Sequence, residues 1–296
     1  MKRTASARLV FLSAMAIFGT IGVFVRQIPL SSGLLALSRA LIAILFLGGV
    51  LMFGKTKIRL SELKTELLWL LLSGAAMAIN WIFLFESYRY TSVSLATLSY
   101  YFAPVLVTLL SPLLFREKMT PKKWICFAGS TAGLLLMTGI GDVGQGSRHW
   151  LGILLGLGAA CFYATVMLLN KKIKGVAGIP RTFLQFLSAA AVLLIYVLFA
   201  EDVRAVSTLN ASSWVLLLVV GLFHTGFTYC LYFSSMKDLP GQEIAILSYC
   251  DPLIAVLLSV FLLHEAMTLP QIVGGAMILG FTCWNELNGP KRKKNP

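Results

Sequence analysis

The chain has 296 residues, of which 58% are hydrophobic and only 12% are charged, and its formal net charge is +13. A water-soluble domain usually carries about 25% charged residues, so this composition excludes a soluble fold. A lipid bilayer removes the need for a charged surface, because lipid solvates apolar side chains directly.

The apolar runs are continuous, which favours membrane-spanning helices over a barrel of alternating polar and apolar residues. A spanning helix needs roughly 20 predominantly apolar residues. In chain order we predict ten, at residues 8–25, 32–54, 67–87, 92–114, 122–140, 150–170, 182–200, 212–235, 242–263 and 269–287. The first run resembles a signal peptide, but it continues to Val25, so we interpret it as a retained helix.

The basic residues indicate the orientation, because Lys and Arg collect in cytoplasmic loops. With the N-terminus inside, most of the 25 Lys and Arg residues fall in predicted cytoplasmic segments, and the external loops hold only Arg26, Arg89, Arg148 and Arg204. We therefore expect a multi-pass protein of the cell (inner or plasma) membrane with both termini in the cytoplasm.

The sequence repeats itself at an offset of 148 residues between 98–120 and 246–268. The matched pairs include Tyr101 with Tyr249, Pro104 with Pro252, and Glu117-x-Met119-Thr120 with Glu265-x-Met267-Thr268. Because each half holds five predicted helices, the second half enters the membrane from the opposite side. Such inverted repeats are typical of secondary transporters. We predict an all-α membrane protein made of two inverted five-helix repeats, residues 1–145 and 146–296.

Two five-helix halves, each with Tyr-x-x-Pro followed by Glu-x-Met-Thr, resemble the EamA family of the drug/metabolite transporter superfamily over essentially the whole chain. The resemblance implies that ten helices surround a central cavity, with the fifth and tenth at the periphery. It also implies that the protein exports amino acids or other small metabolites by alternating access.

Polar residues at membrane depth are costly unless they face a cavity or a partner. We predict that a solute cavity is lined by residues from several helices, with these candidates: Arg39, Asn80, Trp81, Tyr101, Tyr163, His224, Tyr249 and Asp251. The alternative is interhelical hydrogen bonding within a packed bundle. The paired Pro104 and Pro252 are candidate hinges, or they mark the binding region.

Asp251 is the most informative of these residues, because its repeat counterpart is Ala103 and the symmetry of the scaffold does not require it. A low-dielectric setting favours a protonated carboxyl group, so Asp251, with His224, is a candidate for proton coupling. The alternatives are an ion pair with Arg39 or a hydrogen bond to His224 or a tyrosine. Arg39 and Asp251 together would also suit the carboxylate and amine of a zwitterion.

The sequence thus predicts a secondary transporter, an exporter of amino acids or related amphiphilic solutes, with the solute and the lipid bilayer as partners. The alternatives are a translocase of lipids or lipid-linked substrates, and an intramembrane aspartyl protease that would use Asp142 of Gly139-Ile140-Gly141-Asp142 together with Asp251. We expect no enzymatic activity, no cofactor, no metal and no nucleic acid, and a homodimer stays open.

Overall fold

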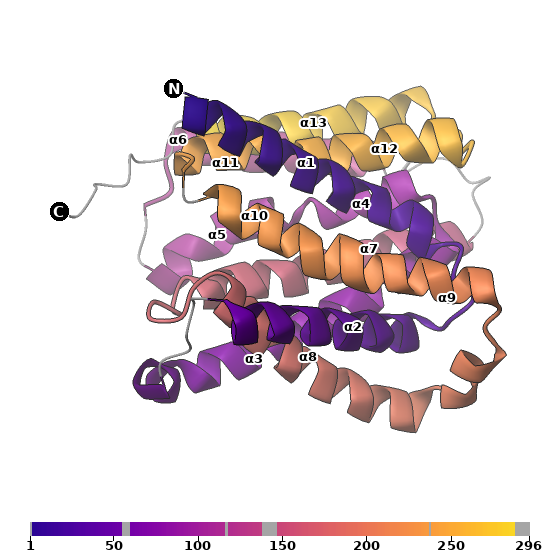
Figure 1. Ribbon diagram of the computed structural model, residues 1–296. Coiled ribbons are helices and arrows are strands. Elements are labelled where there is room, and N and C mark those ends of the chain that lie inside the picture. Colours follow the sequence, from indigo (N-terminus) through magenta and orange to yellow (C-terminus); the bar gives the residue numbers. More distant parts are fainter. Residues whose placement is uncertain (1, 55–59, 116–117, 138–146, 237, 288–296) are drawn as a thin grey trace.

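The computed structural model describes residues 2–54, 60–115, 118–137, 147–236 and 238–287, and within these ranges it contains helices and connecting loops but no strand (Figure 1). The helices, in chain order, are α1 (Lys2–Val25), α2 (Ser32–Phe53), α3 (Leu60–Tyr90), α4 (Val93–Tyr100), α5 (Ala103–Phe115), α6 (Pro121–Met137), α7 (Ser147–Asn170), α8 (Ile179–Ala200), the 3₁₀-helix η1 (Val203–Thr208), α9 (Ala211–Leu218), the π-helix η2 (Val219–Phe227), α10 (Thr228–Met236), α11 (Gly241–Leu247), α12 (Cys250–Leu262) and α13 (Leu269–Leu287).

The ten predicted segments are mainly helical where the structure describes them, apart from breaks within two of them. Seven spans in the described ranges are long and apolar enough to cross a membrane: Ala5–Val25, Ser32–Phe53, Lys64–Tyr90, Val93–Phe115, Arg148–Asn170, Ile179–Ala200 and Ala211–Met236. The chain is therefore a multi-pass membrane protein, while a total of ten crossings stays a prediction. The motif around Asp142 lies outside the described residues.

Two segments predicted as continuous helices are interrupted, which corrects the sequence analysis. The segment at 92–114 breaks at Tyr101 and Phe102, and the segment at 242–263 breaks at Ser248 and Tyr249. Tight 3₁₀-type bonds replace the α-helical ones, from Phe102 N to Ser99 O at 3.2 Å and from Tyr249 N to Ile246 O at 3.2 Å. Each break precedes one of the repeat-related prolines, which lacks the N–H that would continue the helix.

The contacts between helices have the same pattern in both halves. Helix α3 packs along α7 much as α1 packs along α10, and α7 packs on α4 and α5 as α1 packs on α12. Helix α3 also packs on α8 as α2 packs on η2, while the contacts of α6 with α13 and of α2 with α8 each join equivalent helices of the two halves. At the α6–α13 contact, a Cβ on Gly133 would lie 2.7 Å from the Gly274 carbonyl oxygen, so small residues allow the close approach.

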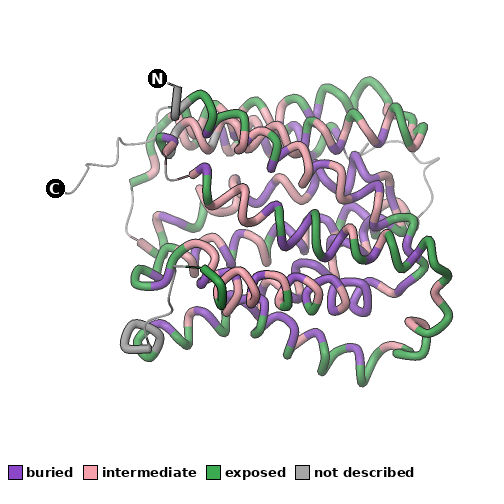
Figure 2. The backbone as a smooth tube through the Cα atoms, viewed as in Figure 1, coloured by how far each residue is buried: buried purple, intermediate pink, exposed green. Residues whose placement is uncertain are grey.

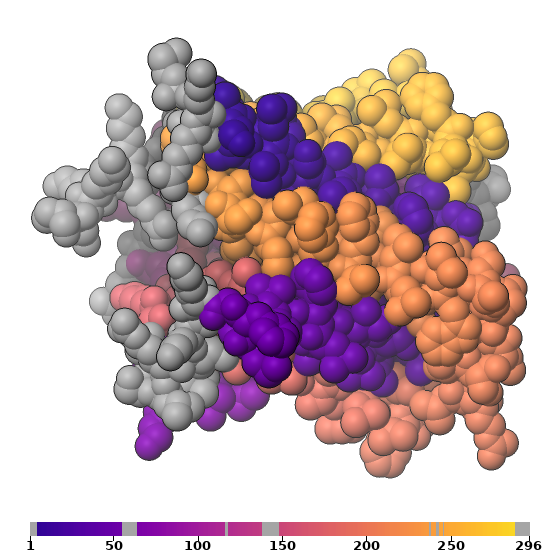
Figure 3. Space-filling model, viewed as in Figure 1, coloured from indigo at the N-terminus to yellow at the C-terminus, as the bar shows by residue number. Residues whose placement is uncertain are grey.

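The outer surface of the bundle is apolar, as expected for contact with lipid. Figure 2 shows exposed residues along the outer helices and buried residues gathered inside the bundle. The exposed side chains include Leu45, Phe199 and Phe261. On one face α1, α10 and α2 lie side by side (Figure 3).

Candidate functional site

Five tyrosines from four helices gather inside the bundle, near the break between α4 and α5. We call them the tyrosine cluster: Tyr88 of α3, Tyr100 of α4, Tyr101 just after it, Tyr163 of α7 and Tyr229 of α10. Tyr100 stacks on Tyr163 with ring centroids 5.0 Å apart, and its edge meets Tyr101 at 5.8 Å. Tyr88 is buried, and the other four tyrosines are half-buried. The cluster therefore offers aromatic faces and hydroxyl groups at the centre of the protein.

Asp251 joins this cluster from the second interrupted helix. The Tyr101 hydroxyl donates a hydrogen bond to Asp251 Oδ2. In the part of the chain that the structure describes, Asp251 forms no ion pair with Arg39 and no hydrogen bond with His224. The alternatives for the partner of this carboxylate were Arg39, His224 and a tyrosine, and in the structure the partner is a tyrosine.

Helix α1 packs closely behind Asp251. A Cβ on Gly19 would lie 2.6 Å from the Asp251 carbonyl oxygen and 2.9 Å from Ile254 Cβ. Only a residue without a side chain fits at this contact, so α1 supports the backbone that carries the carboxylate.

Arg39 faces the tyrosine cluster from α2 and is only 6% exposed. Its Cζ lies 4.3 Å from the Trp81 ring centroid and 5.1 Å from that of Phe85. Among the described residues it has no hydrogen bond and no ion pair, and its buried Nε atom lacks a partner. The guanidinium group is therefore held by aromatic faces while its N–H donors stay unused.

His224 lies in η2, where the helix widens to a π-helix. Its Nε2 is 2.7 Å from Thr20 Oγ1 of α1, and its Nδ1 is 3.3 Å from the Val219 carbonyl oxygen. The ring also packs against Phe24 at 4.7 Å between centroids. His224 thus links α1 to η2, beside the tyrosine cluster.

Two of the predicted candidates lie elsewhere. Asn80 donates from Nδ2 to the Ala159 carbonyl oxygen of α7 at 2.6 Å, which is a helix–helix contact. Tyr249 lies beside Thr282, Cys283 and Glu286, on the side of α13.

The structure brings the remaining candidates together around the cluster: Arg39, Trp81, Tyr101, Tyr163, Asp251 and, at its edge, His224. The predicted third helix ends at residue 87 and so omits Tyr88, although α3 continues to Tyr90. Extending the helical spacing of that segment by one residue would have included it.

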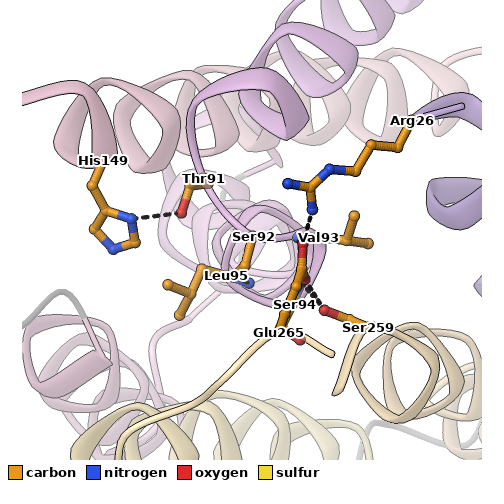
Figure 4. Close-up of polar contacts among 9 residues, drawn as sticks. All are labelled: Arg26, Thr91, Ser92, Val93, Ser94, Leu95, His149, Ser259 and Glu265. Carbon is orange, nitrogen blue, oxygen red and sulfur yellow. Dashed lines mark hydrogen bonds and ion pairs between the residues drawn. The ribbon is translucent and has the colours of Figure 1, made fainter. Parts of the chain in front are cut away.

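One end of the bundle is tied together by Glu265, which follows α12 (Figure 4). Its carboxylate accepts a hydrogen bond from Val93 N at 2.9 Å, at the start of α4, and contacts Arg26 and the Ser259 hydroxyl. A carboxylate is favoured at a helix N-terminus, where backbone N–H groups are free. Glu265 thereby connects the segment after α1 with α4 and α12.

A cavity of about 500 Å³ opens at this end, between the end of α1, the start of α2 and the end of α3. Polar and apolar groups contribute about equally to its lining, and the polar side chains include those of Ser31, Ser32, Arg26 and Arg89. The lining residues are Val25, Arg26, Ile28, Pro29, Leu30, Ser31, Ser32, Leu35, Phe85, Tyr88 and Arg89.

Known proteins resemble this chain over most of its length. Residues 5–139 and 150–285 each match the EamA-like transporter family. The uncharacterized transporter YxxF of Bacillus subtilis is 34% identical over 283 residues, which cover 94% of this chain and 88% of YxxF. An uncharacterized transporter of Archaeoglobus fulgidus is 30% identical over 200 residues, covering 66% of this chain and 68% of its own. A solved structure described as "Crystal structure of protein" superposes with a TM-score of 0.62 at 20% identity, covering 94% of this chain and 96% of the other, which shows a shared fold.

Proposed function

We propose, from the premise that this chain belongs to the EamA-like transporter family, that it exports amino acids or related amphiphilic solutes by alternating access and couples this transport to protons. Its residues 1–145 and 146–296 would form the two inverted repeats. Both termini would lie in the cytoplasm.

The observation that carries the proposal is the hydrogen bond between Tyr101 and Asp251. It joins the break before α5 to the break before α12, which are at equivalent positions of the two repeats. In secondary transporters the substrate and the coupling ion bind near the middle of the membrane, where such discontinuous helices meet. A solute held there would contact both halves and could follow their movement.

The chemistry of the tyrosine cluster suits an amphiphilic solute. Small-molecule sites are mostly apolar and aromatic, with a few polar groups that fix the orientation of the ligand. Here the aromatic faces are those of the tyrosines and Trp81, and the polar groups are their hydroxyls, Arg39 and Asp251. Sugars would need more amide and carboxylate groups than these helices provide.

Asp251 is the proposed proton carrier. The ionisable groups that face it are Tyr88, Tyr100, Tyr101, Tyr163 and Tyr229, with Cys250 next to it in sequence, and helix α1 contributes only backbone at Gly19. All of these neighbours are neutral when protonated, so the carboxyl group can gain or lose a proton without breaking an ion pair. His224 is the second candidate for proton coupling. A change in its protonation would act on α1 through the contact of its ring with Thr20.

Purified protein in lipid vesicles tests this proposal. Counterflow with a panel of radiolabelled amino acids and aromatic amphiphiles identifies a transported solute, and an imposed pH gradient tests coupling. The Asp251→Asn variant should keep counterflow and lose the acceleration by the pH gradient. Asp202→Asn is the matched control, because this carboxylate is exposed and bonds only the nearby Arg204 N.

Acceleration by the pH gradient that survives in Asp251→Asn would refute the coupling. If the protein moves fluorescent lipids across the vesicle membrane and transports none of the solutes, lipid translocation becomes the better description of its function.

A further inference from the structure

Arg39 is a buried cation without a counter-charge in the part of the chain that the structure describes. A charged side chain inside a membrane protein is costly, and it usually pairs with another charge or marks a substrate pathway. Two carboxylates of this part of the bundle are engaged elsewhere, since Asp251 accepts from Tyr101 and Glu86 contacts Ser32 and Arg89. The positive charge of Arg39 is therefore available to an anion that is not part of the protein.

The geometry around Arg39 indicates which kind of anion fits. Trp81 and Phe85 lie close to the guanidinium carbon, at 4.3 Å and 5.1 Å from their ring centroids, and they hold it by cation–π contact. None of the N–H groups of Arg39 donates a hydrogen bond to another described residue, so these donors are available to a ligand. Those donors form a rigid fork that matches the two oxygens of a carboxylate.

The 500 Å³ cavity lies next to the surroundings of this side chain, although Arg39 is not itself one of its lining residues. Leu35 lies in the cavity wall and is one helical turn before Arg39 on α2. Phe85 also lies in the wall, and the same ring contacts Arg39. Phe85 therefore takes part both in the cavity wall and in the aromatic contact that holds the guanidinium group.

The cations at the mouth of the cavity differ from Arg39 because they are already paired. Arg26 contacts Glu265, and Arg89 Nη1 lies 3.4 Å from Glu86 Oε2. An anion that enters the cavity thus meets compensated charges first and an uncompensated charge further in. This order favours binding at Arg39 rather than at the mouth.

We infer that the cavity between α1, α2 and α3 is a carboxylate-binding passage, with Arg39 as the residue that selects the anion and Phe85 as the side chain that borders both. This inference rests on the proposed function, and it deepens it by assigning the substrate a carboxylate and a route. It also assigns two tasks to different helices beside the tyrosine cluster. Arg39 of α2 holds the carboxylate of the substrate, and Asp251 of α12 holds the proton.

Binding to the detergent-purified protein tests the inference without any transport. The probes are phenylacetate and phenylacetamide, which match in size and differ in charge, and the readout is tryptophan fluorescence. Trp81 lies against Arg39 and should report binding, so the Trp81→Phe variant identifies its part of the signal. We expect phenylacetate to bind at least tenfold more tightly than phenylacetamide.

Variants at two arginines make the test specific. Arg39→Gln should abolish the preference for the acid, and Arg39→Lys should retain part of it. Arg204→Gln is the matched control, because it removes an exposed cation that does not line the cavity, and affinity should stay within twofold. Equal binding of acid and amide, or an acid preference that persists in Arg39→Gln, would overturn the inference.

A labelling experiment keeps the test independent of how the Arg39 variants fold. In a Leu35→Cys variant with Arg39 intact, phenylacetate should slow the reaction of the new thiol with a small thiol reagent, followed by mass spectrometry of that peptide, and phenylacetamide should not. Equal protection by both compounds would contradict the inference. Should vesicles show solute flux without any acid preference, only this inference falls; acid binding without flux would instead refute the proposed function.

Discussion

The Tyr101 hydroxyl donates a hydrogen bond to the Asp251 carboxylate, and this bond connects the two interrupted helices at their breaks. The two residues are not repeat equivalents, because Tyr101 corresponds to Tyr249 and Asp251 corresponds to Ala103. Tyr249 lies beside α13 instead. The repeat-related scaffold therefore carries an asymmetric hydrogen-bonded pair, and the proposed proton coupling would use this asymmetry.

The first prediction concerns this bond. Tyr101→Phe keeps the ring and removes the donor, so Asp251 loses its hydrogen bond from the cluster. A hydrogen bond to a charged group contributes about 1.5–3 kcal/mol, and we expect proton-driven flux in vesicles to fall about tenfold or more. Tyr196→Phe on the exposed side of α8 is the control. Unchanged flux in Tyr101→Phe would show that the bond is incidental.

The positions of the helices could be predicted from sequence, whereas the neighbours of their side chains could not. Lipid requires long apolar segments, so the ten predicted segments are mainly helical where the structure describes them. The direction in which a polar side chain points depends on helices far away in sequence. Asn80 and Arg39 had the same status as candidates, yet Asn80 bonds the backbone of α7 and Arg39 has no partner among the described residues.

The two helix breaks have a signal in the sequence, which is the proline that follows each of them. The sequence predicts continuous helices around Pro104 and Pro252, which are candidate hinges or marks of the binding region, whereas in the structure each proline follows a break by two or three residues. The missing N–H of proline accounts for the interruption. The π-helix around His224 has no such signal, and its widening is stabilised by Thr225 and Thr228, whose hydroxyls bond carbonyls five residues back at 2.8 Å and 2.7 Å.

The second prediction concerns the close contact between α1 and α12. In Gly19→Ala the new methyl group would lie 2.6 Å from the Asp251 carbonyl oxygen, so the helices must separate. Overpacking of this kind costs about 1–3 kcal/mol, and the apparent melting temperature in detergent should fall. Gly49→Ala is the matched control, since its Cβ would meet nothing within 4 Å. Equal melting temperatures for both variants would contradict the packing described for α1.

The third prediction concerns the carboxylate at the end of the bundle. Glu265→Gln keeps the shape of the side chain and removes the charge that serves Arg26 and the start of α4. Because the group is largely buried, we expect a loss of about 1–3 kcal/mol, measured as a lower melting temperature. Arg89→Gln breaks an exposed ion pair at the same end and should cost less than about 1 kcal/mol. A larger effect in Arg89→Gln than in Glu265→Gln would reverse this assignment.

The last prediction separates the two interpretations of Asn80, which are solute contact and helix packing. Asn80 is buried and bonds the Ala159 carbonyl oxygen at 2.6 Å, so Asn80→Ala should weaken the contact of α3 with α7. Interhelical polar contacts in membranes contribute about 0.6 kcal/mol on average, and the lost side-chain volume adds to this, so a loss of about 1–2 kcal/mol is expected. Ser130→Ala is the control, because it removes a buried hydroxyl that has no partner and should leave the melting temperature unchanged. The solute concentration for half-maximal flux should be the same in both variants. If Asn80→Ala instead raises that concentration tenfold and melts like the parent protein, Asn80 contacts the solute and its bond to α7 must open during transport.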